Sequence, residues 1–263
     1  MEHHRFKRED GIPEVDILGI HVHRVSSSDI QSIILKRIRE NDRGVFLYVH
    51  LHSINLAQAD DELRSMFNSA TITYCDGEGV RIGARLLGHF LPERIPLTRW
   101  IYPFLDFCVL NTLSVYCIGT EERIIRRAIG VLCDRFPALK IAGFHDGFFH
   151  TDGERSAEVL RDIRNTRPDI LIVGMGTPLQ EFWVRDHWDE LQAGCILTAG
   201  SCFDYIAGEK QACPPWMAEH GLEWLHRLIR EPRRVWKRYL IGIPLFLWRI
   251  LSQWSRMKFT RAD

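Results

Sequence analysis

The pattern that most constrains the fold is a unit that recurs through most of the chain: a short apolar run ends at a turn, and a helix-like stretch follows. Such runs are typical of buried strands, and helices between them are typical of parallel sheets. We expect strands at residues 45–49, 70–75, 114–118, 140–144, 170–173 and 195–198, and helices at 54–67, 80–87, 154–166 and 180–191, with one more running through Cys133. The sequence therefore predicts an α/β fold, a mostly parallel, Rossmann-like sheet flanked by helices.

Glycine turns follow four of the expected strands. Carboxyl ends of parallel strands lie at one edge of a sheet, where glycines let a ligand approach the backbone and helix N-termini offer amides to a diphosphate. We therefore expect a ligand cleft along this edge. The turns form no G-x-G-x-x-G fingerprint, so a nicotinamide-dependent dehydrogenase is not indicated. The glycines are Gly77, Gly79, Gly119, Gly174, Gly176 and Gly200.

Asp76 stands directly after the strand expected at 70–75 and before the first glycine turn. A carboxylate in this place is suited to act as a catalytic base. An aspartate ahead of a helix is also common as an N-cap, here for residues 80–87. The local sequence leaves both interpretations open.

Pro178, Gln180 and Glu181 follow the third glycine turn at the start of an expected helix. One interpretation is ordinary capping by Thr177, with Glu181 placed against the helix dipole. The other directs the Gln180 amide into the cleft, where it would hydrogen-bond sugar hydroxyls. The spacing does not choose between them.

Composition changes after residue 207. Residues 208–263 carry eleven lysines and arginines against five acidic residues, and five of the eight tryptophans, in a chain whose formal net charge is zero. Prolines divide this part into helical stretches near 224–229 and 232–239 and a last amphipathic one. We expect a core at 1–207 and a basic amphipathic helical appendage at 208–263 that binds an anionic membrane surface and offers apolar faces for homo-oligomers.

Other partner classes find little support in the sequence. The longest apolar run, residues 240–248, is interrupted by Gly242 and Pro244 and is too short to span a bilayer. The appendage lacks a nucleic-acid-binding module, and none of the twelve histidines has the spacing of a metal site. Seven cysteines without a C-x-x-C pair, and a charged N-terminus without a signal peptide, favour reduced thiols in a cytoplasmic protein that needs no cofactor.

An ordered series of motifs from about residue 15 to 248 resembles the WecG/TagA/CpsF family, glycosyltransferase family 26. The motifs in the body are Leu56-Ala57 with Asp60, Asp76-Gly77-Glu78-Gly79, Leu86-Leu87-Gly88, Leu91-Pro92-Glu93-Arg94, Gly174-Met175-Gly176-Thr177-Pro178-Leu179-Gln180-Glu181, and Gly200 with Phe203-Asp204 to Gly208. Those in the appendage are Pro215-Trp216-Met217, Gly221-Leu222-Glu223-Trp224, Arg227-Leu228, Glu231-Pro232-Arg233-Arg234 and Arg238-Tyr239-Leu240.

The resemblance implies a membrane-associated enzyme, peripheral on the inner face of the cell membrane, in exopolysaccharide or cell-surface glycopolymer synthesis. It would move a sugar from a UDP-sugar to a polyprenyl-diphosphate-linked sugar, with inversion and without a metal. Asp76 matches the general base, and Arg94 and Gln180 match cleft positions. The motif glycines with Pro178, Glu181 and Asp204 would line the site, and Arg227, Arg234 and Lys237 would meet the diphosphate.

One segment departs from the family pattern. Many members carry Thr-Pro-Asn where this chain has Tyr48-Val49-His50, followed by His52 and Asn55. His50 or His52 would fill the polar role of the missing Asn, or the histidines satisfy only local backbone groups. Since the segment is expected to line the sugar pocket, the donor stays open between a hexose such as glucose and N-acetylmannosamine or its uronic acid. A rival hypothesis is a catalytically inactive scaffold of a polysaccharide assembly complex at the membrane.

Overall fold

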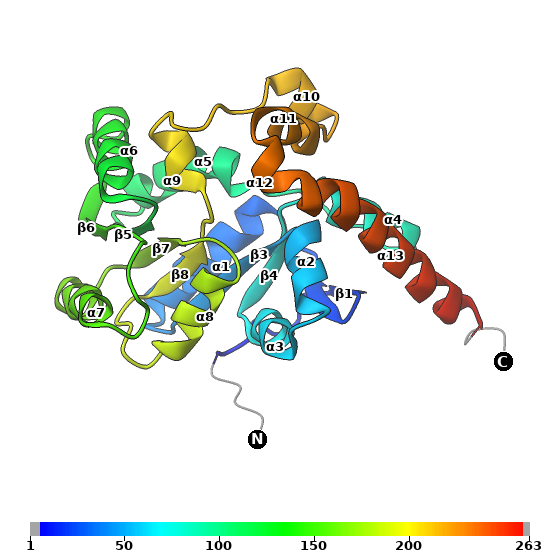
Figure 1. Cartoon of the computed structure of the whole chain (residues 1–263). Coiled ribbons are helices and arrows are strands. Elements are labelled where there is room, and N and C mark those ends of the chain that lie inside the picture. Colours follow the sequence, from blue (N-terminus) through cyan, green and yellow to red (C-terminus); the bar gives the residue numbers. More distant parts are fainter. Residues whose placement is uncertain (1–5, 260–263) are drawn as a thin grey trace.

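Six parallel strands form the centre of the protein in the order β4–β3–β8–β7–β5–β6 (Figure 1). The computed structural model describes residues 6–259, so the ends of the expected core and appendage, 1–5 and 260–263, lie outside the described residues. The strands are β3 (Gly44–Val49), β4 (Ile72–Cys75), β5 (Ser114–Gly119), β6 (Lys140–His145), β7 (Ile170–Gly174) and β8 (Cys195–Thr198). All six strands expected from the sequence are present, and the predicted fold class is confirmed.

Helices cover both faces of this sheet and enclose two apolar cores. This explains why the central strands read as continuous apolar runs, since both faces of each strand are buried. One face carries α1 (Ser27–Arg39), α5 (Leu97–Leu110), α6 (Glu122–Arg135) and α9 (Cys202–Ile206). The other carries α2 (Leu51–Ala57), α3 (Asp61–Ser69), α4 (Glu78–Leu86), α7 (Glu154–Thr166) and α8 (Leu179–Asp186).

Two helix boundaries differ from the sequence prediction. The single helix expected at 54–67 is wrong, because the Asp60 carboxylate accepts the N–H of Leu63 and starts α3 as a separate helix. Helix α8 ends at Asp186 and not at Leu191, because residues 187–190 form a turn. The hairpin of β1 (Glu14–Ile17) and β2 (Ile20–His23), and helices α1 and α5, were not predicted.

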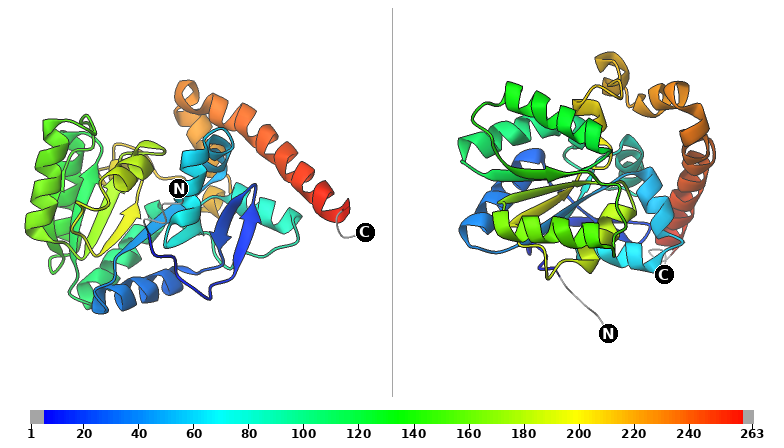
Figure 2. Two further views of the ribbon diagram at one scale, coloured as in Figure 1. Left: turned by 90° about the horizontal axis from the view of Figure 1, so that it is seen from below. Right: turned by 60° about the vertical axis from the view of Figure 1, so that its left-hand side comes forward.

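The C-terminal part folds into α10 (Pro215–Glu219), α11 (Glu223–Arg230), α12 (Pro232–Trp236), the π-helical turn η1 (Lys237–Ile241) and α13 (Gly242–Phe259). Figure 2 shows η1 and α13 as one rod that runs past the β4 side of the sheet. Pro244 does not end this rod; it lies in the first turn of α13, directly after the wide turn of η1. No helix within residues 6–259 is both long and apolar enough to cross a membrane.

Helix α13 is fastened to the body at several points. Phe246 and Ile250 are fully buried, and both lie against Gly83 of α4, where an added Cβ would meet Phe246 at 3.0 Å. The Asn55 amide donates to Gly242 O at 2.8 Å and accepts from Arg249 Nη1 at 2.8 Å. These contacts make α13 one wall of the body and not a free extension.

Candidate active site

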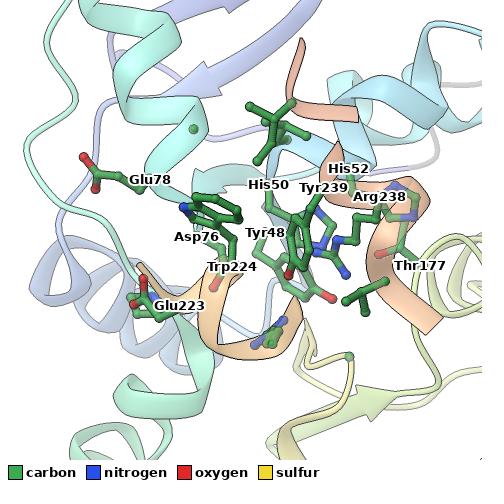
Figure 3. A pocket seen from close by; sticks show the side chains of 18 of the residues that line it. Tyr48, His50, His52, Asp76, Glu78, Thr177, Glu223, Trp224, Arg238 and Tyr239 are labelled. Carbon is green, nitrogen blue, oxygen red and sulfur yellow. The ribbon is translucent and has the colours of Figure 1, made fainter. Parts of the chain in front are cut away.

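A cavity of about 670 Å³ lies between the carboxyl ends of the strands and the C-terminal helices. Figure 3 shows its polar side chains, with Glu78 and Glu223 on one side and His52, Arg238 and Thr177 on the other. Most of the residues expected to form the site line this cavity. They are His50, His52, Asp76, Gly77, Gly79, Arg94, Gly176, Gly200, Arg227, Arg234 and Lys237. The predicted edge of the sheet is therefore the edge that carries the cavity.

Asp76 lies at the end of β4, where its backbone N–H donates to Val49 O at 3.0 Å. The N-cap of α4 is Gly77, and no side chain caps that helix, so the interpretation of Asp76 as a helix cap is wrong. Asp76 is one of the residues that line the cavity. Burial raises the pKa of Asp76 above its ordinary value, while nearby arginines act in the opposite direction. A carboxylate with a raised pKa is a stronger base than an ordinary aspartate and is suited to accept a proton.

Two arginines from the C-terminal helices lie close enough to Asp76 to affect its pKa. Burial alone would lower the pKa of Arg227, but Tyr205, Tyr239 and Asp76 around it raise that pKa. Burial lowers the pKa of Arg238, which is a cation nonetheless because guanidinium groups stay protonated in proteins. The two cations and Asp76 place both signs of charge in one cavity, as a site for an anionic ligand and a proton transfer requires.

Arg94 joins the body to the C-terminal helices. Its Nη1 lies 2.6 Å from Glu223 Oε1 of α11, and its Nη2 donates to the carbonyl of Ala218 in α10 at 3.2 Å. On the other side, its Nε lies 3.8 Å from Glu78 Oε2. Arg94 therefore lines the cavity while its Nη1 and Nη2 atoms are engaged by protein groups.

Gln180 does not reach the cavity, contrary to the sequence interpretation that directed it into the cleft. It is fully buried, and its Oε1 accepts the N–H groups of Gly176 at 3.2 Å and Gly200 at 3.0 Å. Its Nε2 donates to Tyr48 Oη at 3.2 Å and to Glu181 Oε1 at 2.9 Å. Gln180 thus ties two glycine turns to β3, and those two amides are not available to a diphosphate.

Glu181 lies beside Gln180 and is also fully buried. Its Oε1 accepts from the Thr177 hydroxyl at 3.0 Å, whereas Oε2 is buried and has no hydrogen-bond partner among the described residues. Burial raises the pKa of Glu181 to about 7. The N-cap of α8 is Pro178, with no side-chain cap, so the interpretation of Thr177 as the cap is wrong.

His50 satisfies a local backbone group and also lies at the cavity. It is the N-cap of α2, and its Nδ1 accepts the N–H of Ser53 at 3.0 Å. An acceptor Nδ1 places the proton of the neutral ring on Nε2, and the residue also lines the cavity. Burial and the neighbouring Arg238 lower the pKa of His50, and they lower that of His52 to about 4. Both rings are neutral, and Asn55 contacts α13 instead of the cavity.

A second cavity of about 230 Å³ adjoins the first and shares Gly176, Gly200, Ser201 and Arg234 with it. Gly174 and Asp204 line this cavity. The Asp204 carboxylate accepts from the Thr120 hydroxyl at 3.2 Å and lies 3.4 Å from Lys210 Nζ. Gly119 and Pro178 line neither cavity; an added Cβ on Gly119 would lie 2.5 Å from the carbonyl oxygen of Gly174, so this glycine lets two strand ends approach.

Sequence reasoning did not single out several residues that line the large cavity. They are Tyr48, Glu78, Glu223, Trp224, Arg238 and Tyr239. All six lie in segments that were quoted for the family resemblance or for the departure from it, so their place in those segments was the available signal. Among residues 6–259, no group of three or more His, Cys, Asp or Glu side chains is arranged to hold a metal ion.

Comparison with known proteins agrees with the resemblance seen in the sequence. The model of the glycosyl transferase WecG/TagA/CpsF family matches residues 15–260. Similar proteins from Staphylococcus aureus strains MW2 and NCTC 8325 are named N-acetylglucosaminyldiphosphoundecaprenol N-acetyl-beta-D-mannosaminyltransferase. Each is 24% identical over 255 residues, covering 93% of this chain and 95% of the relative.

Proposed function

The chain belongs to the WecG/TagA/CpsF family of glycosyltransferases, and from this we propose that it transfers a sugar from a UDP-sugar to a polyprenyl-diphosphate-linked sugar, with inversion at the anomeric carbon. The observation that carries the proposal is Asp76, a carboxylate with a raised pKa that lines a cavity together with Arg227 and Arg238. The product would be a lipid-linked precursor of a cell-surface glycopolymer.

In this proposal Asp76 is the general base. It takes the proton of an acceptor hydroxyl as that oxygen attacks the anomeric carbon, and the bond from this carbon to the UDP oxygen breaks on the opposite face. A single displacement of this kind inverts the configuration. Burial supports the role because a raised pKa makes the carboxylate a stronger base.

Diphosphate groups are the natural ligands of the cavity's cations. Arg227 and Arg238 lie close enough to Asp76 to affect its pKa, and Arg234 and Lys237 also line the cavity. Charge that develops on the departing UDP, or that is carried by the acceptor, would be stabilised by these side chains. Because the amides of Gly176 and Gly200 are engaged by Gln180, side chains carry more of this work than the glycine turns predicted from the sequence.

The exposed apolar side chains of α13 support a peripheral place on an anionic membrane. Trp248 is 65% exposed, and Leu251 and Trp254 are exposed as well. Arg256 and Lys258 lie on the same helix, so aromatic and basic groups share one rod. Such a rod would hold the cavity close to a lipid-linked acceptor.

For the donor, the names of the relatives make UDP-N-acetylmannosamine the first sugar nucleotide to test. UDP-glucose and the UDP-linked uronic acid of N-acetylmannosamine follow, because His50 and His52 lie in the segment that differs from the family pattern and line the cavity. A neutral His50 with its proton on Nε2 offers a hydrogen-bond donor to a sugar oxygen.

The test is transfer of label from a panel of radiolabelled UDP-sugars to N-acetylglucosamine diphosphate carried on a lipid. We expect Asp76→Asn to lower kcat by at least about 100-fold while UDP binding, measured by calorimetry, persists. Asp106→Asn, an exposed aspartate on α5, is the matched control and should keep its activity. An active Asp76→Asn enzyme would exclude Asp76 as the base, and a wild-type protein that transfers no sugar would favour the scaffold hypothesis.

A further inference from the structure

One side of the large cavity is apolar. It is formed by three neighbouring helices, α2, α4 and α13, whose contributions are Leu51, Ile82, Ile243, Phe246 and Leu247. Close packing fixes this wall, since added Cβ atoms on Gly79 and Gly83 would meet Leu51 and Phe246 at 3.0 Å. We call the half-open part of this wall, Leu51, Ile82, Ile243 and Leu247, the apolar groove.

The apolar groove is continuous with the outer surface of the protein. Ile82 is 42% exposed and Leu247 is 37% exposed, and both also line the cavity. Beyond them, exposed Leu86 on α4 and Trp248 and Leu251 on α13 extend the apolar surface along the two helices. Figure 1 shows α13 passing beside α4 on the side away from α6 and α7. A hydrocarbon chain could therefore enter the cavity without crossing a polar rim.

The charges of the cavity lie next to the groove. Arg238 in η1 and Ile243 in α13 are five residues apart on one rod, a rise of at most about 8 Å. A ligand that fills both parts must carry an anionic group and, within a few bonds, an apolar chain. A sugar nucleotide has no such chain, so the complementarity selects the acceptor over the donor.

We propose that the apolar groove binds the first isoprenyl units of the lipid-linked acceptor, with the diphosphate held by Arg227 and Arg238. The proposal rests on the function proposed above and adds that the protein recognises the lipid itself. The membrane would then deliver a substrate whose chain leaves the bilayer between α4 and α13. Neutral apolar side chains would contribute to acceptor affinity through buried hydrocarbon area.

The test compares two acceptors in the absence of membranes and detergent. Both carry N-acetylglucosamine diphosphate, one on a propyl and one on a farnesyl chain, each kept below its micelle concentration. For the wild-type protein we expect the KM for the farnesyl acceptor to be lower by about tenfold or more, since each buried methylene group contributes measurably. The ratio of the two KM values within one variant is the readout, so a general loss of activity does not affect it.

Ile82→Ser and Leu247→Ser should each lower the ratio of the KM for the propyl acceptor to the KM for the farnesyl acceptor to between about one and three. Both side chains are partly exposed, so the variants are expected to fold, which a thermal melt checks. Leu110→Ser on α5, where Leu110 is 82% exposed and lines neither cavity, is the matched control and should keep the wild-type ratio.

A wild-type ratio near one, or a ratio unchanged in both groove variants, would overturn the groove assignment. Groove variants that keep the ratio but alter sedimentation would show that a second copy of the chain covers this surface, which also overturns it. Failure of the proposed function is distinct, because the wild-type protein would then transfer sugar to neither acceptor.

Discussion

Glutamine in place of Glu181 should make the protein more stable at alkaline pH. Glu181 is fully buried behind the cavity, with Oε1 bonded to Thr177 and Gln180 and Oε2 without a partner among the described residues. A glutamine keeps the accepting oxygen and places its amide where the protonated acid would hold its hydroxyl. The variant therefore resembles the neutral form of the wild-type protein at every pH.

The size of the effect follows from the pKa of Glu181, which burial raises from an ordinary 4.5 to about 7. The folded state thus binds the proton more tightly than the unfolded state. Below pH 4.5 both states are protonated and nothing is lost; as pH rises to about 7 the unfolded state alone ionises, and the free energy of unfolding falls. Above that pH the full loss is about 3 kcal/mol.

Urea unfolding of both proteins at about pH 5 and about pH 9 measures this loss. We expect Glu181→Gln to equal the wild type within about 1 kcal/mol at the lower pH and to exceed it by about 3 kcal/mol at the higher. Glu158→Gln, an exposed glutamate on α7, is the control and should show no pH-dependent difference. A difference that stays the same at both pH values, or a less stable Glu181→Gln protein at the higher pH, would refute the reasoning.

Two further predictions concern the C-terminal helices. Glu223→Gln weakens the contact with Arg94, so it should lower the free energy of unfolding by about 2 kcal/mol and raise KM. Urea unfolding and initial rates measure the two effects. Unchanged values of both would contradict the role of this contact as the link between α11 and the body. Trp248→Ser should weaken binding to vesicles that contain anionic lipid by roughly tenfold, measured by cosedimentation, because the largely exposed tryptophan is then no longer available to enter the lipid. Leu110→Ser is the control. Equal binding by the two variants would contradict the membrane-facing orientation of α13.

Most of the sheet was predictable because β3, β4, β7 and β8 are buried at every position and β5 at all but its first, so each carries its signal in a short local window. The β1–β2 hairpin was not, since its two strands pair only with each other and each includes an exposed position, so neither forms a continuous apolar run. The break between α2 and α3 was missed because the apolar periodicity continues across it, and the only local signal is the capping carboxylate of Asp60.

The site was predictable where a residue's position along a strand decides its place, as for Asp76 and the glycine turns. It was not predictable where a polar side chain could bind either a ligand or another part of the protein. Gln180 bonds to Tyr48, 132 positions earlier in the chain, and Asn55 accepts from Arg249, 194 positions later. Such partners lie outside any local pattern, so the same residue types at the same spacing could have faced the cavity.

The order in which the lining residues are synthesised determines when the large cavity can form. Tyr48 on β3 is made early, whereas Ile243 and Leu247 are made only after all six strands of the sheet. A growing chain can therefore complete its sheet before residues 243–247 are available to close the large cavity. A stop codon ahead of residue 243 would leave all six strands intact and remove the part of the cavity wall that α13 supplies.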